Sequence, residues 1–309
     1  MSYQEIAQKI GRSKSTISRE ISRNGGKENY LIVNAHHRYI RKRKKYRKPR
    51  ILSKGPLRDL VIRCILLKKW SPEQISNRSK YEGKQTLSHN TIYRAVYKDN
   101  LGIKLESHGA RCIDLKFRHG GKSRHTKTTT DNRGRRFWDA PSIHSRPRSA
   151  QNRSRFGYLE ADTVRGKTGK AALITLVDRK SRFLLAQRVE KVNSKLVSQG
   201  IIELLETMPP NKVLPITPAR GSEFTKYKEF SEILGVNVYF PDPHSPHQRG
   251  TNENTNGLLR EYFPRNKDID ELNEPEIAQV IDQLNHRPRK ILGWKSPYEV
   301  FYGVSLRLI

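Results

Sequence analysis

The chain has 309 residues, more than one domain usually holds, so two or three folded units are expected. Lys and Arg number 61 against 30 Asp and Glu, and residues 1–150 hold 37 of these basic residues and only 11 of the acidic ones. Such a charge is too high for a generic soluble enzyme and favours a polyanionic partner, nucleic acid first and an anionic membrane second. A membrane protein and a disulfide scaffold are also excluded, because the longest nearly apolar run is 171–177 and the chain has only two cysteines, Cys64 and Cys112.

The first 24 residues predict two short helices across a glycine turn. Ser2 and Glu5 form a capping box, Gly11 ends the first helix, and Ser13 caps a second helix that ends at 24–26. This spacing favours a helix-turn-helix, with an ordinary polar helical hairpin as the alternative. The outward mixture of hydroxyls and cations suits base edges and phosphates in a DNA groove. The candidate DNA contacts are Arg12, Ser13, Lys14, Ser15, Thr16, Ser18, Arg19 and Arg23.

A second helix-turn-helix is predicted further along the chain. An apolar helix over 57–65 is followed by Ser71 and Pro72, a cap and a proline at the first helical position, and then by a third helix over 88–97. Cys64 falls on the apolar stripe of its helix, which indicates a core position rather than a redox centre. The candidate DNA contacts of this unit are Ser88, His89, Asn90, Thr91, Tyr93 and Arg94.

Two basic stretches separate these units from each other and from the second half. Residues 41–50 contain eight cations, whose mutual repulsion predicts a solvated arm that becomes ordered on phosphate, with a targeting or solubility segment as the alternative. Residues 107–156 are rich in arginine and poor in aliphatic residues, so they predict an extended linker without a core of its own. The candidate contacts of the arm are Arg41, Lys42, Arg43, Lys44, Lys45, Arg47, Lys48 and Arg50.

From residue 156 onwards the pattern is that of an α/β domain. The alternation in 158–164 predicts a strand with Glu160, Asp162 and Val164 on one face. Residues 171–177 predict a strand covered on both faces, and a turn at 178–181 leads into an antiparallel strand at 183–186. A helix over 194–208, a strand over 213–217, a helix over 226–234 and a strand over 236–240 follow. This order is that of a ribonuclease-H-like core.

The segment 249–264 predicts a further helix. Its residues Thr255, Leu258 and Leu259 fall on one stripe, and Glu253 falls on the opposite side. On composition alone, Glu253 belongs to a solvated helix face.

Several long motifs resemble the DDE transposases of the IS30 family of bacterial insertion sequences. They are GRSKSTISREISRN, WSPEQIS and SHNTIYRAVY in the first half, and YLEADTVRG, LITLVDRKSR, TPARGSEF, RGTNENTNGLLREYFP and NHRPRK in the second. The resemblance spans nearly the whole chain. It implies all-α helix-turn-helix domains at 1–40 and 55–106, basic linkers at 41–54 and 107–156, and an α/β ribonuclease-H-like catalytic domain of the retroviral-integrase type at 157–309.

The resemblance also implies three carboxylates that hold two divalent ions, Mg²⁺ with Mn²⁺ as a substitute, for cutting and joining DNA. The first is Asp162 and the third is Glu253, but Ala219 stands where the second aspartate is expected. A methyl group offers no oxygen to a metal, and neither Glu223 nor Asp242 is placed by sequence to bridge both ions. We therefore expect a chain that binds DNA but cuts and joins it poorly. Deliberate inactivation is the favoured origin of Ala219, and natural decay is the alternative.

The partners implied are double-stranded DNA, as terminal inverted repeats and target, and further copies of the chain in a dimer or larger assembly, in a bacterial cytoplasm at the nucleoid. Candidate phosphate or base contacts near the carboxylates are Arg249, Asn252, Asn256 and Arg260, with helix capping as the alternative for Asn252. Family members carry an additional helix before the first helix-turn-helix. Two other functions stay open: a DNA-binding regulator, and a ribonuclease-H-like nuclease or resolvase without strand transfer.

Overall fold

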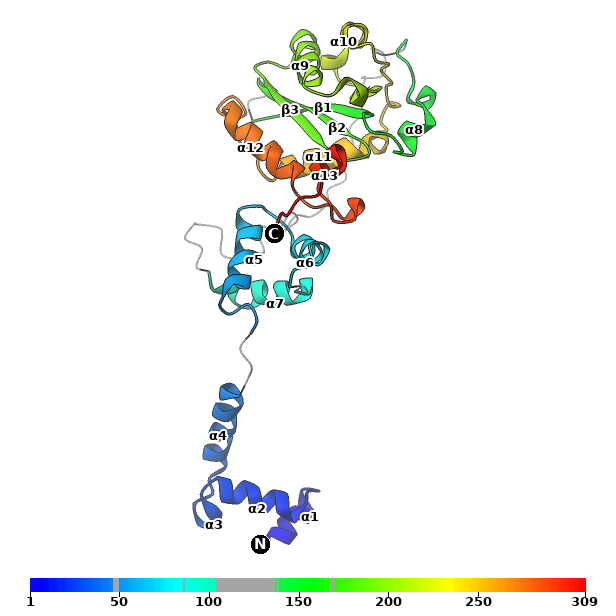
Figure 1. Ribbon diagram of the computed structural model, residues 1–309. Helices are drawn as coiled ribbons and strands as arrows, with labels where there is room; N and C mark the ends of the chain where they lie inside the picture. The colour runs from blue at the N-terminus through cyan, green and yellow to red at the C-terminus, as the bar shows by residue number, and fades with distance from the viewer. Residues whose placement is uncertain (47–49, 86, 104–136, 138, 168–169) are drawn as a thin grey trace. The chain divides into compact units, whose positions relative to one another are not determined.

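The computed structural model describes residues 1–46, 50–85, 87–103, 137, 139–167 and 170–309. The chain divides into two compact units, Met1–Ser53 and Lys54–Ile309, which we describe separately (Figure 1). None of the helices in the described ranges combines the length and apolar character needed to cross a membrane.

The first unit contains four helices, α1 (Tyr3–Lys9), α2 (Lys14–Arg23), α3 (Gly26–Asn29) and α4 (Ile32–Lys45). The two helices predicted for the start of the chain are confirmed with their caps. Ser2 and Glu5 make the capping box of α1, and the Ser13 side chain accepts the backbone N–H of Thr16 at the start of α2. Since α1 and α2 lie across the turn at Gly11, where φ is +62°, they form the predicted helix-turn-helix.

The basic arm is helical over its first residues, which corrects the prediction that it becomes ordered on phosphate. The helix α4 runs to Lys45, and its side chains from Arg41 to Lys45 are exposed. Lys and Arg are good helix formers, and positive charge near a helix carboxyl end is favourable. Arg38 also donates to the backbone oxygen of Arg23 at 2.8 Å, which joins α4 to α2. Arg47 and Lys48 lie outside the described residues.

The second unit begins with three helices, α5 (Pro56–Leu66), α6 (Pro72–Tyr81) and α7 (His89–Asp99), and a short turn, η1 (Asn100–Gly102). Ser71 caps α6 and Pro72 takes its first position, as the sequence predicts. Cys64 is 1% exposed, and burial raises the pKa of its thiol, so its assignment to the core is confirmed. Other buried apolar residues of this helical unit are Val61, Ile65, Trp70, Ile75, Ile92 and Val96.

The sheet has four strands, β1 (Leu159–Arg165), β2 (Ala172–Asp178), β3 (Leu184–Val189) and β4 (Ile216–Pro218). Their order is β3-β2-β1-β4; β1, β2 and β3 are antiparallel neighbours, and β4 runs parallel to β1. Every residue of β2 is buried, as expected for a strand covered on both faces. This arrangement is the ribonuclease-H-like topology that the sequence predicts.

Helices cover both faces of the sheet (Figure 1). On one face, α9 (Ser194–Glu206) and α10 (Tyr227–Leu234) enclose a core with Ala161, Ile174 and Leu176. On the other, α11 (Gly250–Leu259) and α12 (Glu274–Asn285) enclose a core with Val164, Leu173 and Val177. Shorter elements are η4 (Ile143–Ser145), α8 (Arg148–Gln151), η5 (Pro210–Lys212), η6 (Ser222–Phe224), η7 (Pro246–Arg249), η8 (Lys290–Leu292) and α13 (Pro297–Tyr302).

Two expectations for the second half are wrong. The strand expected at 236–240 is reduced to isolated bridges, Ile216 with Val238 and Ser142 with Phe240. The chain around Ile143 reaches that edge, because the Ile143 N–H donates to the Phe240 oxygen at 2.8 Å. The described part of the stretch 107–156 is therefore packed on the α/β domain, with Phe137 in its core, rather than forming an extended linker.

Candidate active site

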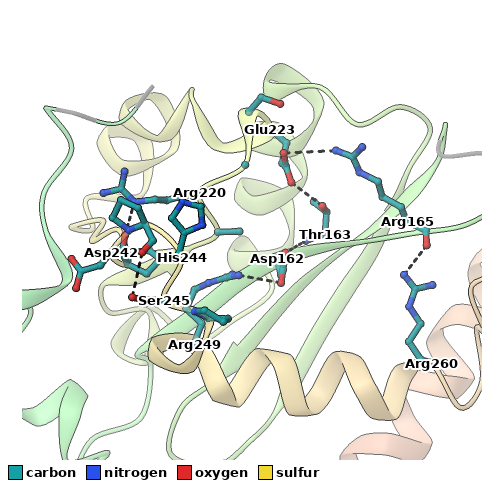
Figure 2. Close-up of a pocket in the computed structure, with 16 residues that line it drawn as sticks. Asp162, Thr163, Arg165, Arg220, Glu223, Asp242, His244, Ser245, Arg249 and Arg260 are labelled. Atoms are coloured by element: carbon teal, nitrogen blue, oxygen red, sulfur yellow. Dashed lines mark hydrogen bonds and ion pairs between the residues drawn. The ribbon is translucent and has the colours of Figure 1, made fainter. Parts of the chain in front are cut away.

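A pocket opens where β4 ends and its pairing with β1 stops, and Figure 2 shows its lining. The parallel pairing of Ala161 with Pro218 brings the next residue of each strand, Asp162 and Ala219, to the same edge of the sheet. The Ala219 N–H donates to the Ala161 oxygen at 3.0 Å. Both positions line the pocket, so the structure brings together two of the three positions that the sequence singles out.

The Asp162 carboxylate is contacted by Arg249, which directly precedes α11, by Asn256 on α11, and by the next residue of β1. Its Oδ2 atom is 3.4 Å from Arg249 Nη2 and 3.4 Å from Asn256 Nδ2, and its Oδ1 atom accepts the Thr163 N–H at 2.8 Å. The Asp162 side chain is 25% exposed, so it remains open to the pocket. The carboxylate therefore has one cationic partner and one exposed side.

Glu253 lies on α11 between the two residues that contact Asp162. It follows Arg249 by four positions and precedes Asn256 by three, which places it on their side of the helix. Its side chain is exposed, whereas Thr255, Leu258 and Leu259 are buried, as the helical spacing predicts. Glu253 does not line the pocket itself. Glu253 thus lies beside the residues that contact Asp162, but outside the pocket lining.

Asn252 corrects a sequence prediction, since it is fully buried and cannot contact DNA in this structure. Its N–H donates to Glu160 Oε2 at 2.8 Å and its Nδ2 donates to the Glu160 oxygen at 3.2 Å. Glu160 is itself buried in an ion pair with Arg179. Asn252 therefore links the first turn of α11 to β1, and it does not cap the helix, because α11 has no side-chain cap.

Two acidic residues that the sequence did not place at the site also line the pocket. Glu223 accepts the Thr163 hydroxyl at 3.0 Å and lies 3.8 Å from Arg165. Asp242 accepts Gln248 Nε2 at 2.7 Å and His144 Nε2 at 2.8 Å, and these hydrogen bonds lower its pKa. The sequence signal for Glu223 is its position in the TPARGSEF motif. Asp242 carries no such signal, because its loop has no regular spacing.

The pocket is lined by more cations than anions. Its lining has three carboxylates, those of Asp162, Glu223 and Asp242. It also has His244 and four arginines, which are Arg165, Arg220, Arg249 and Arg260 (Figure 2). Burial lowers the pKa of Arg260, which donates to the Arg165 oxygen at 2.8 Å. Guanidinium groups in such an arrangement suit phosphate oxygens. Of the predicted contacts near the carboxylates, Arg249, Asn256 and Arg260 are half-buried, and each has a side accessible to solvent.

The donor set does not fit a pair of divalent cations. Among the described residues, no group of three or more His, Cys, Asp or Glu side chains could hold a metal ion. Of the two positions that β1 and β4 bring together, Asp162 supplies oxygen but Ala219 supplies only a methyl group. Paired Mg²⁺ ions need bridging carboxylates to offset their charge.

The other predicted DNA contacts lie on helix surfaces. On α2 and before it, Arg12, Ser13, Lys14, Ser15, Thr16, Arg19 and Arg23 are exposed and Ser18 is half-buried. The Ser13 hydroxyl is already engaged with Thr16 and with Ser15, at 3.0 Å from Ser15 Oγ. On α7 and its cap, Ser88, His89, Asn90 and Arg94 are exposed, whereas Thr91 and Tyr93 are half-buried. Arg50 is exposed beyond α4.

The chain is similar to several insertion-sequence transposases. A helix-turn-helix domain family matches residues 1–24. The chain is 40% identical over 319 residues to the transposase InsI for insertion sequence element IS30A of Escherichia coli (strain K12), covering 99% of this chain and 80% of that one. It is 35% identical to the transposase for insertion sequence element IS4351 of Bacteroides fragilis, covering 97% and 90%.

Among solved structures, the catalytic core domain of BIV integrase is similar with 20% identity and a TM-score of 0.37, covering 47% of this chain and 93% of that chain. A simian T-cell lymphotropic virus intasome in complex with a PP2A regulatory subunit is similar with 18% identity and a TM-score of 0.40, covering 50% and 56%. The strand order of the sheet, rather than these scores, carries the fold assignment.

Proposed function

The chain belongs to the IS30 family of insertion-sequence transposases, and from this premise we propose that it binds the terminal inverted repeats of such an element. The reaction we assign to its active form is cleavage at the element ends followed by transfer of the freed 3′ hydroxyl to target DNA. With Ala219 in place, the chain binds DNA but performs both phosphoryl transfers poorly. Cleavage and joining in this family are a polynucleotidyl transfer, whose catalysis depends on positioning and charge neutralisation.

The observation that carries this proposal is the shared pocket of Asp162 and Ala219. The parallel pairing of β1 with β4 stops there, and Glu253 lies on the neighbouring helix beside the residues that contact Asp162. An aspartate at position 219 would add a second carboxylate to the strand edge next to Asp162. Mg²⁺ binding is accordingly a property we assign to the chain with aspartate at 219.

The DNA-binding surfaces we propose are the exposed faces of α2 and α7 and the cations of α4. Their side chains combine hydroxyl and amide groups, which can read bases, with Lys and Arg, which contact phosphates. The helix-turn-helix domains at 1–40 and 55–106, the catalytic domain that follows them, and the assembly of two or more copies on two element ends belong to the same proposal. The arginines of the pocket would then bind the phosphate backbone of the DNA strand that is cut.

The experiment that tests the proposal compares the chain with its Ala219→Asp and Ala219→Asn variants in Mg²⁺. End cleavage and strand transfer are measured on duplexes that carry the inverted repeat of the element. We expect activity to rise roughly 100-fold or more only with aspartate, because asparagine has similar size but no charge. Equal activity in all three proteins would contradict the role given to position 219.

The two other functions predict different outcomes in the same assays. A DNA-binding regulator stays inactive after Ala219→Asp while it retains its affinity for the repeat. A nuclease or resolvase becomes able to cut, but it fails to join pre-cleaved ends to target DNA. Joining of pre-cleaved ends by the Ala219→Asp variant therefore distinguishes the transposase from both.

A further inference from the structure

A buried arginine joins α6 to the end of the chain. Arg78 is 0% exposed, and each of its five N–H donors has an acceptor. Its Nε donates to Glu82 at 2.7 Å, its Nη1 to Glu299 at 2.6 Å and to the Trp294 oxygen at 3.0 Å, and its Nη2 to Glu299 at 2.8 Å and to the Leu306 oxygen at 2.6 Å. Four of these five bonds reach residues more than 200 positions away in the sequence.

The two carboxylates that hold Arg78 also hold the backbone of the last residues. Glu82 accepts the N–H groups of Leu308 at 2.7 Å and Ile309 at 3.2 Å. Glu299 accepts the N–H group of Leu306 at 2.9 Å. The segment 306–309 is thus fixed between the helical unit α5–α7 and the α/β domain.

The backbone near Arg78 adopts a conformation that non-glycine residues rarely take. Trp294 has a φ of +70°, and its oxygen is the one that accepts from Arg78. Lys69, on the opposite side of the contact, has a φ of +52° and donates to the Glu261 oxygen at 2.6 Å. Such conformations persist where the surrounding contacts impose them. Both strained residues therefore mark a specific docked arrangement.

The contact reaches the helix that carries the candidate site residues. Glu261 follows α11 by two residues, so Lys69 fixes the helical unit directly to the end of that helix. Gln74 of α6 donates to the Pro288 oxygen at 2.8 Å, and Lys68 donates to the Leu308 oxygen at 2.6 Å. A shift of the helical unit would separate the buried Arg78 guanidinium from Glu299 and from the Trp294 and Leu306 oxygens. It would also separate Glu82 from the N–H groups of Leu308 and Ile309, and these losses strongly disfavour intermediate positions.

We propose that Arg78 is a positioning residue that makes α5–α7 and the catalytic domain one rigid body. The protein itself then fixes the distance along the DNA between the sequence that α7 reads and the phosphodiester that reaches the Asp162 pocket. This inference rests on the proposed function, because it needs α7 to bind the terminal repeat.

The test maps that distance without requiring catalysis. Ser222 is exposed and lines the pocket, so Ser222→Cys in a Cys112→Ser background can carry an iron chelate that cleaves nearby DNA by radicals. The parent should cut a repeat-bearing duplex in one narrow cluster at a fixed distance from the repeat. Arg78→Lys keeps the charge but loses the planar fork. We expect Arg78→Lys to widen the range of DNA cleavage positions at least about twofold, because α5–α7 and the catalytic domain then move separately.

A matched control and a folding measurement complete the test. Lys290→Ala removes an exposed ion pair with Glu73 at the edge of the same contact and should leave the cluster narrow. Hydrogen exchange should show faster exchange at Leu306, Leu308 and Ile309 in Arg78→Lys, with β2 still protected. Should Arg78→Lys fail to fold, Glu82→Gln replaces it. If the DNA cleavage positions of Arg78→Lys are as narrowly clustered as those of the parent, the inference is wrong but the proposed function stands. If the parent does not bind the repeat, the proposed function is wrong as well.

Discussion

At the scale of single residues, Glu299 has the most altered acidity among the described carboxylates whose values are resolved. Burial by itself raises the pKa of its carboxyl group, but hydrogen bonds from Arg78 and from the backbone N–H groups of Ser296 and Leu306 outweigh burial and lower the pKa to about 2. Its side chain is 0% exposed, so these partners replace water completely. The carboxylate therefore stays charged in the folded protein across the physiological range.

This shift predicts how stability depends on pH. A carboxyl group with a lowered pKa in the folded state stabilises the protein above its unfolded pKa, near 4.5, and this contribution is lost as the pH falls toward 2. In urea unfolding at pH 7, Glu299→Gln should lose about 3 kcal/mol of unfolding free energy. The difference between parent and variant should shrink between pH 4.5 and 2.

The control for this prediction is Glu73→Gln, which removes an exposed ion pair with Lys290 from the same contact. It should cost at most about 1 kcal/mol at pH 7. A Glu299→Gln variant that loses no more than this control would show that the buried pair with Arg78 contributes little.

At the scale of elements, α9 approaches the sheet closely at Gly200. A Cβ atom at this position would lie 2.6 Å from Ile174 Cδ1 on β2. Ile174 is fully buried, so its side chain has little space into which it can move. Glycine here permits the helix to pack tightly on β2, the strand that pairs with β1.

Gly200→Ala should therefore destabilise the protein by about 1–2 kcal/mol, although alanine favours a helix more than glycine does. The comparison is Gln199→Ala, one residue earlier on the exposed side of α9, which should change stability by less than about 0.5 kcal/mol. Thermal unfolding of both variants checks the prediction. Stabilisation by Gly200→Ala would mean that helix preference outweighs the contact with Ile174.

At the scale of the whole molecule, charge is distributed unevenly between the two units. Residues 1–53 contain 15 Lys and Arg residues and only 3 acidic residues. A unit of this charge attracts nucleic acid over several ångströms, and its affinity must fall as salt rises.

The predicted measurement is the dependence of DNA affinity on salt concentration. A plot of the logarithm of the binding constant against that of salt should have a steep negative slope, and Lys44→Ala with Lys45→Ala should reduce its magnitude by about 2 if each contacts one phosphate. Lys191→Ala with Lys195→Ala removes two exposed cations of the α/β domain and should leave the slope unchanged. A slope that is unchanged in the first pair would exclude α4 from the phosphate contacts.

The sequence by itself determined the features that depend on neighbouring residues. The caps at Ser2, Ser13 and Ser71, the buried strand β2 and the buried stripe of α11 follow from hydrogen bonds and spacing within a few positions. The Asp162 face of β1 follows from strand alternation in the same way. The helix α4 was missed because its charges, rather than its helix-forming residues, dominated the prediction.

Only the tertiary structure decided which distant groups meet. Glu160 with Asn252, Thr163 with Glu223, and Arg78 with Glu299 are separated by 92, 60 and 221 positions. Local sequence patterns do not predict such pairs, because each pair depends on how whole elements pack. Packing decides which buried polar groups lie close enough to form hydrogen bonds. The sequence thus determined which helices and strands form, whereas their packing decided that Asn252 is structural, that Glu223 lines the pocket and that α6 is fixed to the chain's last residues.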